Sequence, residues 1–360
     1  MDSFEYNVNP GRIVFGSGSI NKLPEEIKRL NASSPLLLST SRGTKYTNKL
    51  AEILRRASIE PAGTFNNAVT HTPVSVTDQA MESMEQKTAD CVVSIGGGSV
   101  VGLGKPLSIR TGLPHICIPT TYAGSEMTPI LGETDAGKKV TRTDPNVLPA
   151  VVIYDVDLTM TLPIAVCTTS GVNAIAHAVE ALYAKNTNPI LSLLALEGVK
   201  VLAEALPPII QDPSSKPTRE RALYGAWLCG TCLGFSAMGL HHKICHTLGG
   251  SFGLPHAETH TIVLPHALSY NAPAIAKQMR DLATVLPDSE GDALKGLSLL
   301  LKSLNAPRAL RDFGMKESDV DRAVGLVMGA QYSNPRALER EGVRELLRRA
   351  WAGETARADR

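Results

Sequence analysis

Histidines recur at helical spacing in the second half of this chain of 360 residues. His242 and His246 lie four residues apart in GLHHKICH, and His256 follows in GLPHAETH. In an earlier segment, SGVNAIAHAVEALYA, His177 lies four residues after Asn173. Residues four apart on a helix share a face, so two helices and a loop could direct His177, His242 and His256 at one point. Three converging imidazoles are a typical ligand set for a divalent transition metal.

The fourth side chain of this set, Asn173, bears on whether a metal is bound. A carboxylate supplies a transition metal with charge and basicity, whereas a neutral amide supplies neither. A site of three histidines can still bind zinc, so the amide weakens the prediction of a metal without excluding it. We expect no required metal; if one is bound, its ligands would be His177, His242 and His256.

A second group of residues is suited to a nucleotide. SIGGGSVVGLGK (94–105) places Gly96, Gly97, Gly98 and Ser99 between a predicted strand and a predicted helix. Glycines let the backbone approach a pyrophosphate, and the helix N-terminus supplies amide donors and a favourable dipole. The motif is neither G-x-G-x-x-G nor a Walker loop, and a plain tight turn is the alternative.

Two neighbouring segments support the nucleotide interpretation. In IPTTYAGSEMT (118–128) a predicted strand runs into hydroxyl side chains, and ligands of open α/β sheets bind at that carboxyl edge. An earlier strand ends in STSR without the acidic residue that would bind a ribose 2′-hydroxyl and repel a 2′-phosphate. Arg42 could pair with a phosphate, which predicts use of NADPH as well as NADH; the alternative is a solvated surface arginine. The expected cofactor contacts here are Thr120, Thr121, Ser125, Ser39 and Arg42.

Alternating strands and helices are predicted as far as residue 162. Short apolar runs predict strands, and amphipathic segments predict helices. The strands are SPLLLST (34–40), PAGTFNNAV, ADCVVSI, LPHICIPTT and AVVIYD (150–155), and the helices are 47–58 and 77–87. This order is typical of a doubly wound parallel sheet.

After Pro163 the pattern becomes helical to the end of the chain, with long stretches at 170–185, 190–206, 218–238 and 240–250. We expect Pro207 and Pro208 to break one helix, and Pro255, Pro265 and Pro273 to punctuate later ones. The predicted fold is an α/β N-terminal dinucleotide-binding domain with a Rossmann-like parallel sheet (1–162), followed by an all-α C-terminal catalytic domain (163–360).

Composition excludes several classes of partner. The net charge is +1 and no basic stripe predicts a nucleic acid or a membrane surface. No signal pattern opens the chain, and no apolar run approaches the roughly 20 residues of a spanning helix. Cys229 and Cys232 form a C-x-x-C within a buried-helix pattern, so we expect reduced core thiols in a cytoplasmic protein rather than a redox or zinc motif.

The chain resembles the iron-containing (group III) alcohol dehydrogenase family nearly from end to end. The blocks that carry the resemblance, in order, are NPGRIVFGSGSINKLPEEI, GGGS with Lys105, IPTTYAGSE, GVNAIAHAVEAL, HKICHTLGG, GLPH and VLPHALSYN. The resemblance implies an NADH or NADPH cofactor, an active site in the cleft between two domains, and a homodimer. It also places Lys139 near the nucleotide.

Two departures from the family pattern narrow the resemblance. In metal-dependent members an aspartate and three histidines hold the metal, and the first of these positions matches Asn173. The glycine motif has Gly102 where the family often has aspartate. SGVNAIAHAVEALYA resembles one branch, the maleylacetate reductases, which use NADH or NADPH to reduce maleylacetate to 3-oxoadipate in aromatic compound degradation. That branch is generally regarded as not needing a metal.

The chemistry of that branch agrees with the amide. Hydride added β to the carbonyl of an unsaturated oxo-dicarboxylate leaves an enolate, which an imidazolium or ammonium group can stabilise and protonate. Reduction of an aldehyde instead develops alkoxide charge, where a metal contributes several kcal/mol. The candidate groups are Asn173, His177, His242, His246, His256 and Lys243. The two substrate carboxylates require cations, for which Lys243, Arg142 and Lys139 are candidates.

Two other functions stay open from the sequence. One is a metal-dependent alcohol or aldehyde dehydrogenase that tolerates Asn173, and the other is a non-catalytic nucleotide-binding protein that keeps the scaffold. The remaining histidines are interpreted as residues without a role in the reaction: His71, His115, His241, His260 and His266.

Overall fold

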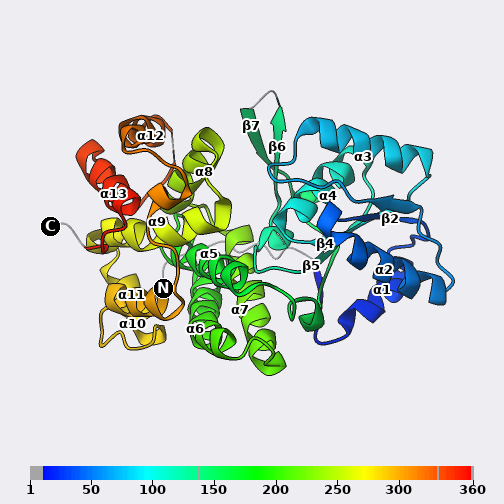
Figure 1. Ribbon diagram of the computed structural model, residues 1–360, viewed down its shortest axis with the longest axis horizontal. Helices are drawn as coiled ribbons and strands as arrows, with labels where there is room; N and C mark the ends of the chain where they lie inside the picture. Colours follow the sequence, from blue (N-terminus) through cyan, green and yellow to red (C-terminus); the bar gives the residue numbers. More distant parts are fainter. Residues whose placement is uncertain (1–10, 136–137, 331, 358–360) are drawn as a thin grey trace. The chain divides into compact units, whose positions relative to one another are not determined.

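The computed structural model describes residues 11–135, 138–330 and 332–357. These residues form two compact units, and the chain passes from one to the other between Leu162 and Pro163. We call them the sheet unit and the helical unit (Figure 1). The predicted fold class, an α/β part followed by a helical part, is confirmed.

The sheet unit is built on six parallel strands in the order β1-β8-β5-β4-β2-β3. Their bounds are β1 (Arg12–Phe15), β2 (Pro35–Leu38), β3 (Gly63–Phe65), β4 (Cys91–Gly96), β5 (His115–Pro119) and β8 (Val151–Tyr154). Five of them match predicted strands. The sixth, β1, was not predicted, because its apolar run is only the three residues Ile13, Val14 and Phe15, and it lies at the edge of the sheet.

Helices cover both faces of this sheet (Figure 1). In β2, Leu37 packs into one core cluster, and Leu36 and Leu38 pack into the other, as the alternation of a strand requires. Because the central strands are buried on both faces, their sequences are continuous apolar runs. The covering helices are α1 (Leu23–Arg29) and α2 (Thr44–Arg56) on the side of Leu37, and α3 (Val74–Gln86) and α4 (Gly98–Thr111) on the other.

A separate antiparallel pair of strands follows β5 in the chain. It consists of β6 (Ile130–Asp135) and β7 (Lys138–Thr143), with Ile130 paired to Thr143. The sequence analysis did not predict this pair, because KKVTRT and ILGETD are largely polar and only weakly patterned.

The helical unit is arranged around α5, in which every residue from Cys167 to Leu182 is buried. This helix packs against α6, α7 and α9, so most of its residues are apolar or small, and the buried Asn173, His177 and Glu180 are exceptions. The helices are α5 (Ile164–Leu182), α6 (Pro189–Gln211), α7 (Lys216–Phe235), α8 (Leu240–Phe252), α9 (His256–Asn271), α10 (Ala276–Val285), α11 (Ala293–Ser303), α12 (Val320–Met328) and α13 (Arg340–Ala352).

The expected effect of three prolines was wrong. Helix α6 continues through Pro207 and Pro208, and α9 contains Pro265. Leu206 and Ile209 are fully buried on either side of the proline pair, so tertiary packing outweighs the lost backbone hydrogen bonds. Pro255, in contrast, directly precedes α9, and Pro273 lies in a 3-10 turn after it.

In the part of the chain that the structure describes, no single helix is both long and apolar enough to cross a membrane. Helices α7 and α8 are long and apolar enough only when they are taken together, by length and composition alone. The chain bends by 93° at the break between them.

Candidate active site

Six histidines from three helices gather in the helical unit, with neighbouring ring centroids between 4.2 and 6.4 Å apart. They are His177 of α5, His241, His242 and His246 of α8, and His256 and His260 of α9. The expected convergence of α5 and α8 is thus present. The loop expected to carry His256 is in fact the first turn of α9, because Pro255 with its fixed φ precedes the helix.

His260 lies at the centre of this cluster. Its ring centroid is 4.2 Å from that of His256, 4.9 Å from those of His241 and His242, and 6.1–6.2 Å from those of His177 and His246. His241 and His260, which the sequence analysis interpreted as residues without a role in the reaction, thus lie within the cluster. His256 and His260 are four residues apart on one helix, and this spacing was the sequence signal that could have placed His260 beside His256.

A chain of hydrogen bonds runs through the buried part of the cluster. Asn173 Nδ2 lies 3.3 Å from His177 Nε2, and His177 Nδ1 lies 2.8 Å from His242 Nε2. His242 Nδ1 in turn lies 2.6 Å from a carboxylate oxygen of Glu180. The sequence analysis missed Glu180, although it follows His177 by three residues and so shares its face of α5.

Glu180 is completely buried, and its carboxylate accepts three backbone N–H groups at the start of α8. The donors are Gly239 at 3.1 Å, His241 at 2.8 Å and His242 at 3.4 Å. Burial raises the pKa of Glu180, and burial together with the neighbouring His241 and His256 lowers the pKa of His242 far below its usual value. Because three N–H donors and a helix N-terminus favour the carboxylate, we assign an ionised Glu180 and a neutral His242.

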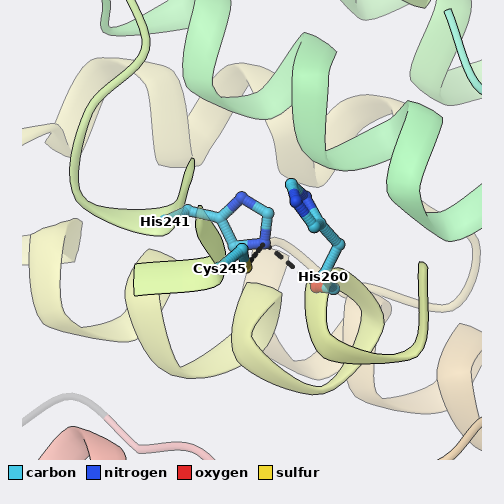
Figure 2. Close-up of side chains that lie close together, drawn as sticks. All are labelled: His241, Cys245 and His260. Carbon is cyan, nitrogen blue, oxygen red and sulfur yellow. Dashed lines mark hydrogen bonds between the residues drawn. The ribbon is translucent and has the colours of Figure 1, made fainter. Parts of the chain in front are cut away.

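The other buried groups of the cluster are less completely bonded. Three buried atoms of the cluster have no hydrogen-bond partner among the described residues. They are Nδ1 and Nε2 of His260 and Oδ1 of Asn173. Figure 2 shows His260 beside His241 and Cys245, and His241 Nε2 lies 3.0 Å from the backbone oxygen of His260 and 3.6 Å from Cys245 Sγ.

The members of the cluster differ in exposure. His177 and His242 are buried, whereas His246 and His256 are exposed at the surface of the helical unit, with their rings stacked at 6.4 Å. Lys243, which follows His242 in the sequence, is half-buried on α8. A ligand reaching this unit would meet His246 and His256 first.

The sheet unit brings the glycine loop to the carboxyl ends of two adjacent strands. Strand β4 ends at Gly96, where the φ of +154° favours glycine. A Cβ added at this position would lie 2.5 Å from the Val100 side chain. Helix α4 starts at Gly98 with Ser99 in its first turn, so its N–H groups open at this edge. The Thr120 N–H donates to the Gly96 oxygen at 3.0 Å, which joins the end of β5 to the loop.

Thr121 and Ser125 complete this edge. A Cβ on Gly97 would lie 3.2 Å from the Thr121 side chain, so the two loops touch. Ser125 opens a 3-10 turn that is tied to a buried lysine, because the Ser125 oxygen accepts from Thr128 Oγ1 and Lys105 Nζ donates to Thr128. Burial lowers the pKa of Lys105 to about 8.

The residues expected at the ribose position lie beyond β2. Ser39 is buried, and its hydroxyl lies 2.7 Å from Asn66 Oδ1 and 3.0 Å from the Thr40 oxygen, so it faces the interior. Arg42 is exposed in the turn Ser41–Gly43. Lys139 belongs to β7, but its side chain lies outside the described residues. On the same strand, Arg142 pairs with Asp144 at 3.7 Å.

Comparison with known proteins identifies the family. The model of iron-containing alcohol dehydrogenases matches residues 10–156, and that of the C-terminal part of the Fe-containing alcohol dehydrogenase family matches residues 167–351. The chain belongs to the iron-containing alcohol dehydrogenase family. As a member, it is an oxidoreductase with a nicotinamide cofactor.

Several relatives of this chain are named maleylacetate reductases. A maleylacetate reductase of Rhizobium sp. (strain MTP-10005) is 48% identical over 353 residues, 98% of this chain and 99% of that protein. The crystal structure of maleylacetate reductase from Agrobacterium tumefaciens is 48% identical with a TM-score of 0.94, covering 99% of this chain and 100% of the other. An iron-containing alcohol dehydrogenase from Corynebacterium glutamicum, 38% identical over 98% of each chain, has a TM-score of 0.93, so backbone similarity alone does not separate the two names.

The family's four metal-binding positions can be tested against these residues. They match Asn173, His177, His242 and His256, but His177 and His242 turn their facing nitrogens toward each other, and Asn173 offers no carboxylate. Two other sets in the described part of the chain bring three donor atoms within 4.8 Å of one another: His241 with Cys245 and His260, and Glu180 with His241 and His242. The family's metal set therefore fits this arrangement poorly.

Proposed function

We propose that this chain is a maleylacetate reductase that transfers hydride from NADH or NADPH to the conjugated carbon–carbon double bond of maleylacetate and forms 3-oxoadipate. Relatives of that name, 43–48% identical over nearly the whole chain, support the substrate. The observation that carries the proposal at the site is Asn173, an amide bonded to His177 where metal-dependent members have a carboxylate.

The sheet unit is proposed to hold the cofactor, which supplies the hydride when bound. Gly96, Gly97 and Gly98 leave the backbone open to a pyrophosphate, and a Cβ on Gly98 would meet only Ala123, at 3.7 Å. Ser99, Thr120, Thr121, Ser125 and Lys139 are the further proposed contacts. Exposed Arg42 and the lack of an acidic residue beside it support use of NADPH as well as NADH.

The helical unit is proposed to manage the proton. Hydride arrives at the carbon β to the ketone, negative charge develops on the ketone oxygen, and one proton is added at the α carbon. The exposed rings of His246 and His256 and the Lys243 ammonium can stabilise that charge and deliver the proton. The buried pair His177 and His242 lies behind them and keeps a fixed hydrogen-bonded arrangement.

We also propose that the reaction needs no metal. The enolate is less basic than an alkoxide and can be stabilised by hydrogen bonds and a cation. An amide in place of a carboxylate, beside two imidazoles bonded to each other, is a weak donor set for a transition metal.

The deciding experiment measures NADH oxidation with maleylacetate, with and without a chelator. We expect equal rates, and a kcat at least about tenfold lower in His246→Ala or His256→Ala. His71→Asn, in the sheet unit, is the matched histidine control with unchanged kcat. Activity lost to the chelator and restored by iron or zinc would support a metal-dependent alcohol dehydrogenase instead. No oxidation with unsaturated oxo-diacids or aldehydes would support a nucleotide-binding protein without catalysis.

The proposal extends to the state of the enzyme. We propose a cytoplasmic homodimer that acts on a small molecule and needs no nucleic acid or membrane. The basis is the family resemblance together with a net charge of +1. Light scattering of the purified protein tests the dimer, and a monomer mass would contradict it.

A further inference from the structure

Glu180 lies at the inner end of the hydrogen-bonded chain, and the proposed chemistry gives it no role. We propose that Glu180 is a positioning residue for the reductase reaction, because it holds hydrogen on Nδ1 of His242 and thereby fixes the tautomers of both His242 and His177. This inference rests on the proposed function, since the histidines that it orients lie behind those proposed to act on the substrate.

The hydrogen-bonding capacity of each group determines the direction of the chain. An ionised carboxylate only accepts hydrogen bonds, so the 2.6 Å contact to Glu180 requires hydrogen on His242 Nδ1. A neutral imidazole carries one hydrogen, and His242 Nε2 must therefore accept from His177 Nδ1 at 2.8 Å. His177 Nε2 is then an acceptor, and it faces the donor nitrogen of Asn173 at 3.3 Å.

A second contact points to the same tautomer independently. His241 Nε2 lies 3.0 Å from the backbone oxygen of His260, which can only accept, so His241 carries its hydrogen on Nε2. His241 Nδ1 is then an acceptor. It lies 3.4 Å from His242 Nδ1, which is compatible only with hydrogen on the His242 atom.

Glu180 is itself held rigidly. It is completely buried on α5 and accepts the N–H groups of Gly239, His241 and His242, while no side chain of α8 caps its own N-terminus. One carboxylate thus caps α8 from another helix and orients a histidine in the first turn of α8. Both tasks need a group that only accepts hydrogen bonds.

The first experiment uses the unaltered protein and needs no substrate. Protein with ¹⁵N-labelled histidines is studied by NMR, and the His242 signals are assigned by comparison with His242→Gln. We expect hydrogen on Nδ1 of His242 and His177, and on Nε2 of His241. A neutral His242 with hydrogen on Nε2 would overturn the proposal, whether or not the protein reduces maleylacetate.

The second experiment replaces Glu180 by its amide. In Glu180→Gln the amide offers one acceptor oxygen instead of two to the three backbone N–H groups and to His242 Nδ1, so the tautomers of His242 and His177 are no longer fixed. We expect NMR signals of mixed tautomers for His242 and His177, and a kcat with maleylacetate that is about 10- to 100-fold lower, the loss seen for hydrogen-bond partners of metal-ligating histidines. The KM for NADH should not change, because the glycine loop belongs to the sheet unit.

The matched control is Glu26→Gln, another buried carboxylate, which pairs with Arg12 in the sheet unit at 2.8 Å. We expect it to leave kcat and the histidine signals unchanged. A folded Glu180→Gln variant with the kcat of the parent would refute the positioning role. If that variant does not fold, the His242 tautomer measured in the unaltered protein decides whether the proposal holds. If the parent reduces no maleylacetate, the proposed function fails, and the NMR result still tests the assignment of hydrogen.

Discussion

At the scale of single residues, position 173 distinguishes two kinds of buried site. The amide of Asn173 donates to His177 and adds no charge to a site that already holds the Glu180 carboxylate. An aspartate would bring a second negative charge into a space without solvent, which is costly unless a cation neutralises it. The asparagine therefore suits histidines that bind each other, and an aspartate suits a metal.

Restoring the carboxylate should accordingly restore metal binding. In Asn173→Asp we expect the affinity for zinc to rise at least about tenfold, because a charged ligand is added next to His177. Isothermal titration with zinc, and metal analysis of the purified protein, measure it. Asn188→Asp is the control, since Asn188 caps the N-terminus of α6, where aspartate serves equally well. Equal affinity in the two variants would contradict the expectation.

The sequence predicted much of the candidate site but few of the contacts within it. Helical spacing placed Asn173 with His177 and His242 with His246, and the glycine loop was found from its residue types. Glu180 and His260 were missed as members, because their partners lie on other helices and no local pattern reports such contacts. Which nitrogen faces which partner also follows only from the packing of α5 against α8 and α9.

At the scale of elements, the predictions succeeded where one segment carries its own signal. Strands β2, β4 and β5 are apolar runs because both faces of the sheet are covered. Helix α6 was predicted to stop at Pro207, because the cost of a proline can be read locally and the burial of Leu206 and Ile209 cannot. The pair β6–β7 was not predicted, because each strand alone has only a weak hydrophobic pattern. The strands form because they pair with each other.

The turn between β4 and α4 allows two functions of glycine to be separated. Gly96→Ala should lower the free energy of unfolding by about 1–3 kcal/mol, because φ is positive there and Val100 is too close. Gly98→Ala should leave it unchanged but raise the KM for NADH about tenfold, or ~1.4 kcal/mol, since its Cβ meets little protein and would face the pyrophosphate. Urea unfolding and steady-state kinetics measure these effects. Unaltered NADH kinetics in Gly98→Ala would argue against a phosphate at this turn.

At the scale of the whole molecule, several histidines are held neutral by burial. Burial lowers the pKa of His115 to about 3 and of His266 to about 4, and it lowers the pKa of His241, His242 and His260 as well. An unfolded histidine takes up a proton near pH 6.5, so below that pH the unfolded chain binds more protons than the folded one. Stability is therefore complete above about pH 6.5 and is lost as the pH falls.

We expect acid to destabilise both units. His115 and His266, with pKa values of about 3 and about 4 in the folded chain, should each remove about 1.4 kcal/mol from the free energy of unfolding between pH 7.5 and pH 5.5. Urea unfolding at the two pH values measures the total, and His266→Gln should show a pH dependence smaller by about that amount. An unfolding free energy that stays level down to pH 5.5 would contradict the assignment of these rings as neutral.

The six cysteines are all free thiols and all buried. Burial raises the pKa of Cys91 and Cys232 to about 12, and those of Cys117, Cys229 and Cys245 well above the usual value. Only a thiolate attacks an activated double bond readily, and the proposed substrate is itself such an electrophile. An enzyme that handles a Michael acceptor with its thiols shielded in this way avoids alkylation by its own substrate.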